Sequence, residues 1–371
     1  MKVLFCVRHN FYDSPGGAQI QILKTIEYLK LRGVDCHLTV SSEGIDFNLF
    51  DIVHLSDLTW VYDNLTFLKE LKRQNFKGKK VLSTIYWPFD EYASMGSPLI
   101  QRLFFKAFGI NGFEFAKAVA KYAKTREHVF INGIKRGFIQ NQKAIVKEMD
   151  WLLPNSILEM EALNKRLNLS QENFSVVNNA IDILVFDQII SNSSLIKKEG
   201  LITFVARIDP RKNQLAFLES MMDTDFPIRF IGNSGPNSQG YLENLKKLAI
   251  RRGNVEFVSH IPQEEVFKHM LEAKVNVLTS WIETPGLVSL EAAYAGCNIV
   301  VSDRGSVKDY FGDYAYYCDP QDIVGIKEKV LEALNAEFDP KFKELIKNEY
   351  SWEKTAEQTF SVYKKICREI S

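Results

Sequence analysis

Residues 275–302 read VNVLTSWIETPGLVSLEAAYAGCNIVVS and place two apolar, strand-like runs on either side of a short helical pattern. The first run covers residues 275–279 and the second covers Asn298–Ser302. Between them a Pro-Gly turn leads into a helical pattern that starts near Gly286. A strand, a crossover helix and a second strand form one unit of a parallel sheet. This stretch therefore predicts an α/β fold.

Strand-like runs of the same kind recur along the whole chain, mostly separated by helical patterns. They lie at residues 3–7, 34–40, 51–55, 80–85, 150–154 and 174–177 in the first half, and at 201–206, 227–231 and 255–258 in the second. This alternation is typical of doubly wound parallel sheets, which bind ligands at the C-terminal ends of their strands. A polar stretch at residues 191–200 is expected to link two such α/β domains.

Composition and charge narrow the class of protein. The 371 residues are 46% apolar and 25% charged, which fits two soluble globular domains. The 46 basic and 46 acidic side chains cancel, which argues against a protein that binds nucleic acid over its whole surface. Charged and polar residues appear too early in the N-terminal stretch for a signal peptide. No run of eighteen apolar residues predicts a membrane span. The five cysteines form no CxxC pair. A cytoplasmic protein with reduced thiols is expected.

The Pro-Gly turn of residues 281–296 is the sharpest candidate site. A helix that begins at a glycine turn offers free backbone N–H groups and the positive end of its dipole to a phosphate. Glu283 precedes this turn and Glu291 follows it, and carboxylates are strong acceptors for sugar or ribose hydroxyls. A capped helix with solvated charges explains the same spacing, and both interpretations stand at this stage.

A second candidate site follows the first strand of the second half. Arg207 and Lys212 lie there, where they could bind a diphosphate and neutralise the charge that develops as its bond breaks. A basic turn on the surface is the alternative. Another glycine turn, at residues 231–236, follows a neighbouring strand. In a doubly wound sheet these turns would converge on one crevice.

Together these residues resemble the retaining glycosyltransferases of family 4 over almost the whole chain. Further matching features are Gly16 and Gly17 after the first strand, the stretch NNAID at residues 178–182, and the stretch YSW at residues 350–352. The resemblance implies the GT-B fold, in which two Rossmann-like doubly wound domains face each other across a cleft and a C-terminal helix crosses back to the first domain.

The resemblance also implies domain boundaries. An N-terminal acceptor-side domain would cover residues 1–182 and carry a basic, aromatic helical lobe at 94–148. A C-terminal domain that binds the nucleotide-sugar donor would cover residues 183–350. The helix of residues 351–371 would pack on the N-terminal domain.

Site roles follow from the same resemblance. It implies catalytic roles for Glu283, Arg207 and Lys212, and donor binding by Gly16, Gly17, Arg207, Lys212, Gly286, Leu287 and Glu291. Arg207 and Lys212 would hold the diphosphate, with help from the amides of Gly286 and Leu287. Glu291 would bind the ribose, and Glu283 the hydroxyls of the donor sugar. No metal and no cofactor are expected, and the donor would be linked to UDP or GDP.

The sequence departs from the family pattern at a few positions. Tyr86 stands where the family often has a histidine that contacts the donor sugar, and either Tyr86 or Asp90 could replace that contact. Asp309 stands where a glutamate is commoner. His9 could line the cleft or be a satisfied or surface histidine, and His54 is expected in the core. The motif DTD at residues 223–225 resembles a metal motif of another glycosyltransferase fold, but it precedes its strand and is interpreted as a solvated loop.

Residues 99–147 carry ten basic and two acidic side chains, with aromatic residues interleaved. The basic residues are Arg102, Lys106, Lys117, Lys121, Lys124, Arg126, Lys135, Arg136, Lys143 and Lys147. Such a lobe suits an anionic membrane surface. The alternative is a solvated lobe whose aromatic side chains form its own core. No nucleic-acid partner is expected, because no recognition motif accompanies the charge.

The sequence thus predicts a metal-independent glycosyltransferase of polysaccharide biosynthesis. It would transfer a sugar, with retention of configuration, from a nucleotide-sugar donor to the hydroxyl of a saccharide or lipid-linked acceptor. The predicted location is the cytoplasm. If the basic lobe binds lipid, the protein would lie on the inner face of the membrane as a peripheral protein. Two alternatives remain: a sugar-nucleotide epimerase or hydrolase of similar fold, and a non-catalytic nucleotide-sugar-binding protein.

Overall fold

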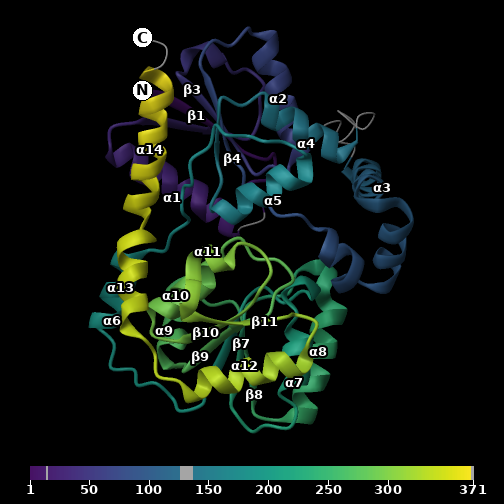
Figure 1. The fold of residues 1–371 in the computed structure, drawn as a ribbon, viewed down its shortest axis with the longest axis vertical. Helices are drawn as coiled ribbons and strands as arrows, with labels where there is room; N and C mark the ends of the chain where they lie inside the picture. The colour runs from purple at the N-terminus through teal and green to yellow at the C-terminus, as the bar shows by residue number, and fades with distance from the viewer. Residues whose placement is uncertain (14–15, 126–136, 369–371) are drawn as a thin grey trace. The chain divides into compact units, whose positions relative to one another are not determined.

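The computed structural model describes residues 1–13, 16–125 and 137–368, and for Ala118 and residues 120–125 only the backbone is described. The chain forms two compact units (Figure 1). The N-terminal unit consists of Met1–Asp90, Ile100–Asn179 and Trp352–Ser371. The C-terminal unit consists of Glu91–Leu99 and Ala180–Ser351. Each unit contains one parallel sheet.

The N-terminal sheet has five parallel strands in the order β2-β1-β3-β4-β5. They are β1 (Lys2–Cys6), β2 (Asp35–Thr39), β3 (Ile52–Ser56), β4 (Lys79–Ser83) and β5 (Trp151–Leu153). The chain passes from β1 to β2 on one side and to β3 on the other. The strand order therefore reverses between β1 and β3, which is where doubly wound sheets bind ligands.

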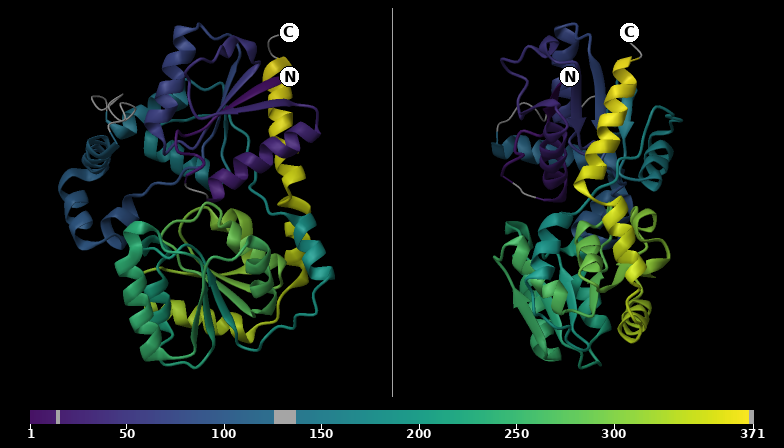
Figure 2. Two further views of the ribbon diagram at one scale, coloured as in Figure 1. Left: turned by 180° about the vertical axis from the view of Figure 1, so that it is seen from behind. Right: turned by 90° about the vertical axis from the view of Figure 1, so that its left-hand side faces the viewer.

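Helices cover both faces of this sheet. They are α1 (Gly17–Leu31), α2 (Val61–Arg73), α4 (Phe138–Lys147), α5 (Ile157–Leu167) and α14 (Trp352–Arg368). The chain also forms α3 (Leu99–Thr125), which lies to the side of this sheet (Figure 1). Helix α14, from the end of the chain, packs beside α1 on one face, together with Val3 and Phe5 of β1 (Figure 1, Figure 2). Leu4 and Cys6 point to the other face, which α2, α4 and α5 cover. The near-continuous apolar run of β1 is explained by this burial on both faces.

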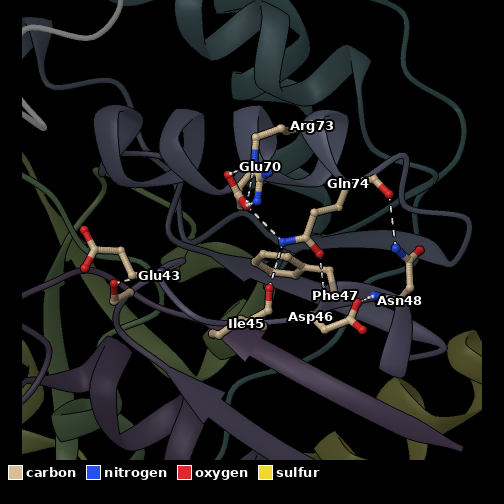
Figure 3. Close-up of polar contacts among 9 residues, drawn as sticks. Glu43, Ile45, Asp46, Phe47, Asn48, Glu70, Arg73 and Gln74 are labelled. Atoms are coloured by element: carbon tan, nitrogen blue, oxygen red, sulfur yellow. Dashed lines mark hydrogen bonds and ion pairs between the residues drawn. The ribbon is translucent and has the colours of Figure 1, made fainter.

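The C-terminal end of α2 fixes the connection between β2 and β3 (Figure 3). The Gln74 amide nitrogen donates to the carbonyl of Ile45 at 2.7 Å, and its amide oxygen accepts from the Phe47 backbone N–H at 2.9 Å. Glu70 binds both Arg73 and Gln74. Phe47 is fully buried at the centre of this connection. These contacts order the chain as it enters β3 at the amino-terminal edge of the sheet, opposite the edge where ligands bind.

The C-terminal sheet has six parallel strands in the order β11-β10-β9-β6-β7-β8. They are β6 (Ile202–Val205), β7 (Ile228–Ile231), β8 (Val255–Val258), β9 (Val275–Leu278), β10 (Asn298–Ser302) and β11 (Ala315–Cys318). This is the strand order of dinucleotide-binding domains, and it reverses between β6 and β9.

Two groups of helices pack on this sheet. The helices are α6 (Ile183–Ser191), α7 (Gln214–Ser220), α8 (Gln239–Arg252), α9 (Gln263–Glu272), α10 (Leu287–Tyr294), α11 (Val307–Phe311), α12 (Ile323–Asn335) and α13 (Pro340–Glu349). Helix α7 contacts α8 and α12, whereas α10 contacts α9 and α13. Across the described parts of both units, no helix combines the length and apolarity that a membrane span requires. All five cysteines are free thiols, and four of them are buried.

The predicted α/β class with two doubly wound parallel sheets is confirmed. Two local predictions were incomplete. Residues 174–177 form no regular strand, because their pairing with β5 is limited to one isolated bridge, between Phe174 and Leu152. Strand β11 was missed because its sequence, AYYC, is short and mostly half-buried at the sheet edge.

The units also differ from the predicted domain boundaries. Residues 91–99, which the sequence placed in or next to the N-terminal lobe, belong to the C-terminal unit. Ala93 and Ser97 are buried there. The other boundaries lie at Asn179 and Ser351, within three residues of the predicted positions.

Candidate functional site

The candidate donor site lies where the C-terminal sheet reverses its strand order. Residues 207–212 follow β6 and are named the basic turn; residues 279–286 follow β9 and are named the Glu283 loop. The two are joined by a hydrogen bond of 2.9 Å from the Trp281 backbone N–H to the carbonyl of Arg211. Because β6 and β9 are adjacent and parallel, their carboxyl ends bring these two segments together.

The basic turn is a capped structure. The Asp209 carboxylate accepts from the Arg211 backbone N–H at 2.9 Å and caps a short 3-10 helix, Pro210–Lys212. Asn213, in the left-handed conformation with a φ of 63°, ends this helix. The Arg207 Nε donates to Asp209 Oδ2 at 3.1 Å, and the Arg207 side chain is half exposed. Asp209 therefore both shapes the turn and orients Arg207.

Lys212 and Glu283 form an ion pair between the basic turn and the Glu283 loop, from Lys212 Nζ to Glu283 Oε1. Only 16% of the lysine side chain and 9% of the glutamate side chain are exposed. Removing such a pair from water is costly unless both partners are well bonded. Two residues that the sequence predicted for the site, 71 positions apart, are therefore brought into direct contact.

A third segment, residues 303–306 after β10, fixes the backbone of Glu283. The Ser306 backbone N–H donates to the Glu283 carbonyl at 3.0 Å. Gly305 has a φ of 92°, and a Cβ at this position would overlap that same carbonyl. Glycine is required here for both reasons.

Helix α10 begins directly after the Glu283 loop. Gly286 precedes it in the left-handed conformation, with a φ of 84°. The backbone N–H groups of Ser289 and Leu290 bond to the carbonyl of Gly286. The amide of Leu287 belongs to the first turn, where helix geometry provides no acceptor within the helix. A helix therefore starts directly after the Glu283 loop, as the sequence predicted, and its binding of an anion stays a prediction.

Glu291 lies in the second turn of α10 and is buried. Its carboxylate accepts a hydrogen bond of 2.6 Å from Gln263 Nε2 of α9, a partner that the sequence analysis missed. Burial raises the pKa of Glu291 from 4.5 to about 7, because a charged carboxylate loses its hydration. The group can therefore change its charge near neutral pH.

Several buried polar atoms at this edge of the sheet have no hydrogen-bond partner within the described residues. They are Gln214 Oε1 and the hydroxyls of Ser280, Ser289 and Ser306. Ser280 lies in the Glu283 loop and Ser306 in the segment of residues 303–306. Gln214 is the first residue of α7, and Ser289 lies in α10. Such atoms in a native fold call for an explanation, for example a ligand or ordered water. Spacing in the sequence gave no indication of them.

The other predicted donor-binding residues, Gly16 and Gly17, lie in the N-terminal unit. Gly16 precedes α1 in an extended conformation, and Gly17 is the first residue of the helix. Their joint role with the C-terminal residues stays a prediction.

Polar and aromatic side chains also gather where the N-terminal sheet reverses its order. Asp63 accepts from the His9 backbone N–H and pairs with His9 Nδ1, both at 2.8 Å. Arg8 lies over the Trp60 ring at 4.7 Å, and His9 meets the edge of the same ring. Burial raises the pKa of Asp57, directly after β3, to about 6. Of this group the sequence analysis had singled out only His9.

Neither Tyr86 nor Asp90 has an exposed, unpaired side chain. Tyr86 is buried, and its backbone N–H donates to Glu159 Oε1 at 2.9 Å. Asp90 pairs with Arg166 at 2.6 Å. Glu159, which the sequence analysis missed, is fully buried, and burial raises its pKa to about 7. Its carboxylate accepts hydrogen bonds from the Thr84 hydroxyl and the Tyr86 backbone N–H, and so fixes the chain directly after β4.

Other predictions from single residues can be placed. His54 is in the core, as predicted, between the hydroxyls of Tyr363 at 2.5 Å and Ser83 at 2.8 Å, and burial lowers its pKa to about 3. Asp223 pairs with Lys327 at 2.5 Å on the surface, which fits the solvated-loop interpretation. Asp309 is exposed on α11. Within residues 1–13, 16–125 and 137–368, no group of three His, Cys, Asp or Glu side chains could hold a metal ion.

The basic lobe is described in part. Helix α3 exposes Leu99, Ile100 and Leu103 on its first turns, beside the exposed Lys106, and Phe115 and Lys117 further on. The Phe113 ring contacts the rings of both Phe104 and Phe105. The side chains of Lys121, Tyr122, Lys124, Arg126, Phe130, Lys135 and Arg136 lie outside the described part of the chain.

Comparison with known proteins bears on the same region. The model of the family described as Glycosyl transferases group 1 matches residues 186–352. The matched residues make up less than half of the chain. O-antigen chain mannosyltransferase B of Escherichia coli is 26% identical over 179 residues, and D-inositol 3-phosphate glycosyltransferase of Mycobacterium sp. (strain JLS) is 28% identical over 176 residues. Each match covers 45% of this chain, and 46% and 40% of the relative. The chain thus spans less than half the length of these relatives.

Solved structures of glycosyl transferases resemble the whole chain. Sucrose-phosphate synthase from Thermosynechococcus elongatus has a TM-score of 0.71 at 16% identity and covers 99% of both chains. Anabaena HepE in complex with UDP-glucose has a TM-score of 0.59 at 14% identity, again with 99% of both chains covered. At this identity the likeness shows the fold alone, and the predicted GT-B fold is confirmed. The matched family region contains Arg207, Lys212, Glu283, Gly286, Leu287 and Glu291.

Proposed function

We propose that this chain is a glycosyltransferase that transfers a sugar from a nucleotide-sugar donor to a hydroxyl acceptor, with retention of anomeric configuration. The observation that carries the proposal is the Lys212–Glu283 pair, which lies at the strand-order reversal between β6 and β9, next to the start of α10. A cation for phosphate, a carboxylate for hydroxyls and a helix N-terminus are the groups that a sugar diphosphate needs.

Each residue has a defined part in this proposal. Arg207 and Lys212 hold the diphosphate together with the amides of Gly286 and Leu287 and stabilise the charge that develops as the sugar leaves. Glu283 binds hydroxyls of the donor sugar, and Glu291 binds those of the ribose. These basic groups take the place that a metal ion has in other transferases. Retention and membership of family 4 rest on the resemblance of the motifs, including Gly16 and Gly17.

The donor is proposed to be linked to UDP or GDP. The HepE structure, a complex with UDP-glucose, supports a uridine nucleotide, and the similarity to a mannosyltransferase makes a GDP-linked donor worth testing. The acceptor is proposed to be a saccharide or lipid-linked intermediate of polysaccharide biosynthesis. It would bind at the carboxyl edge of the N-terminal sheet, where the His9–Asp63 pair and Trp60 offer hydrogen bonds and an aromatic ring.

A binding screen tests the donor part. We expect UDP-glucose or GDP-mannose to raise the Tm of the wild type, because a ligand that binds the native state stabilises it. Incubation of that donor with saccharide acceptors, followed by NMR of the product, tests transfer and the anomeric configuration. Nucleotide release that is independent of any acceptor would favour a hydrolase or epimerase, and binding without release would favour a non-catalytic protein. Absence of any shift with both donors would contradict the proposal.

A peripheral membrane contact through α3 is proposed as well. The exposed Leu99, Ile100 and Leu103 beside Lys106 form an apolar face with a basic neighbour, which suits an anionic lipid surface. Co-sedimentation with vesicles of phosphatidylglycerol and phosphatidylcholine is expected for the wild type and should fall for Leu103→Glu and for Lys106→Glu. Replacing the exposed Ile250 of the C-terminal unit with glutamate is the matched control. Equal sedimentation of all variants, or none by the wild type, would favour the solvated lobe.

A further inference from the structure

Residues 91–99, named the strap segment, lie on the C-terminal unit, although the chain before and after them belongs to the N-terminal unit. The segment contains a π-helix, Tyr92–Gly96, closed by a hydrogen bond of 2.8 Å from the Ser97 backbone N–H to the Tyr92 carbonyl. Ala93 and Ser97 are buried. Short π-helical turns are rare and occur frequently at functional sites.

The strap segment packs against the Glu283 loop. Gly96 lies directly on the Trp281 side chain, and a Cβ at residue 96 would come within 2.5 Å of the indole ring. Trp281 is two residues before Glu283, and its backbone N–H is bonded to the basic turn. A displacement of Trp281 would therefore move both partners of the Lys212–Glu283 pair.

The strap segment also contacts the basic turn and the segment that follows β10. The π-helix lies against the 3-10 helix Pro210–Lys212. Burial, and then the negative charge of Asp209, raises the pKa of Tyr92. Glu91 pairs with Arg304 at 2.6 Å, and Arg304 directly precedes the glycine that supports the Glu283 carbonyl. One segment of nine residues thus meets all three segments that position Lys212 and Glu283.

We propose that the strap segment is a positioning element of the donor site, in which Gly96 and the Glu91–Arg304 pair set the positions of Glu283 and Lys212. Its residues touch neither reacting group and act through Trp281 and the residue 303–306 segment. The proposal rests on the proposed function for the identity of the ligand. Because α3 begins at Leu99, the strap segment also joins the donor site to the exposed apolar face of α3 through continuous backbone.

Two sets of variants test the proposal, each with a matched control in the same unit. Gly96→Ala should lower kcat/KM for the donor about tenfold or more, because small misplacements of a site reduce the rate strongly. Gly240→Ala is its control, since nothing lies within 4 Å of a Cβ there. Glu91→Ala and Arg304→Ala should each lower kcat/KM about two- to fivefold. Glu332→Ala, which removes an exposed pair with Lys329, is their control.

The readout separates positioning from stability. The test measures kcat and KM of every variant with UDP-glucose or GDP-mannose, whichever the wild type uses, and the Tm of every variant. Arg304 also pairs with Asp303 and, at 3.3 Å, with Asp319, so the double variant Glu91→Ala/Arg304→Ala should be no worse than Arg304→Ala alone. Glu91→Gln should recover part of the activity of Glu91→Ala because its amide oxygen still accepts from Arg304. This ion-pair series keeps the test valid if Gly96→Ala fails to fold.

Two outcomes would overturn the inference, and they differ. If the wild type transfers sugar and all strap variants match their controls in kcat/KM, the strap segment has no role in the donor site and the proposed function is unaffected. If the wild type binds neither donor, the proposed function fails, and the strap proposal fails with it.

Discussion

Replacing Glu291 with glutamine is expected to stabilise the protein above pH 7 and to weaken donor binding at the same pH. The Glu291 carboxyl is buried, and its pKa rises from 4.5 to about 7. At about 1.4 kcal/mol for each pKa unit, ionisation of this group costs the native state roughly 3 kcal/mol. Glutamine has nearly the same shape, stays neutral, and can still accept the hydrogen bond from Gln263.

The sign of the pH dependence follows from the raised pKa. Below pH 4.5 both the native and the unfolded states are protonated at Glu291, so the wild type and Glu291→Gln should be equally stable. Between pH 4.5 and about 7 the unfolded state is ionised first, and the stability that the raised pKa contributes is lost as the pH rises. At pH 8 the glutamine variant should be more stable by up to about 3 kcal/mol, which corresponds to a higher Tm by roughly 2–4 °C for each kcal/mol.

Donor binding should have the opposite pH dependence, if the carboxylate binds ribose hydroxyls as proposed. The ionised fraction of Glu291 falls from about 0.9 at pH 8 to about 0.1 at pH 6, so the Kd for the donor should rise roughly tenfold. Calorimetric Tm values at pH 5 and 8 and titration calorimetry with UDP-glucose or GDP-mannose measure both effects, and the exposed Glu332→Gln is the control. The reasoning is refuted if Glu291→Gln is no more stable than the wild type at pH 8, or if the wild-type Kd is the same at pH 6 and 8.

Three further variants separate chemistry from folding. Glu283→Gln should lower transfer at least a hundredfold, measured as product formed, while UDP affinity is kept because Lys212 is released from its pair; wild-type turnover would contradict its role. Gly305→Ala should lower both Tm and activity, because its Cβ overlaps the Glu283 carbonyl at a φ of 92°; an unchanged Tm would refute this. Glu159→Gln should destabilise the protein by about 1–3 kcal/mol in urea unfolding, because an amide nitrogen would face the Asn155 backbone N–H that now donates to Oε2; a gain in stability, as expected for Glu291→Gln, would contradict it.

The sequence predicted the sheets and the proximity of Lys212 and Glu283 because these follow from local pattern. Strands buried on both faces, such as β3 and β10, read as continuous apolar runs, and the carboxyl ends of neighbouring parallel strands share one edge. Lys212 and Glu283 could therefore be placed together from their positions after β6 and β9. The edge strand β11 is only partly buried and carries no such run.

The parts that the sequence could not predict depend on contacts between distant residues. Glu91 and Arg304 are 213 positions apart, and no local sequence pattern predicts that they pair. The same is true of Gln263 and Glu291, whose contact joins the first residue of α9 to the second turn of α10. The burial that raises the pKa of Glu159 and Glu291 is likewise a property of packing. The spacing to Glu283 singled out Glu291 in the sequence, but neither its burial nor that of Glu159 follows from a local pattern.

Charge pairing at the donor edge indicates which group attracts a phosphate first. The positive charge of Lys212 is offset by the carboxylate of Glu283, and that of Arg207 by the carboxylate of Asp209. A diphosphate has to draw these cations away from carboxylates, which reduces their net attraction. The first turn of α10 has no acidic residue, so the positive end of its dipole is not offset within the helix. We therefore expect the Leu287 amide to make the first phosphate contact, after which the exchange of Lys212 from Glu283 to phosphate leaves the carboxylate available for a sugar hydroxyl. Under the proposed function, the ion pair would hold both side chains in place until a donor binds.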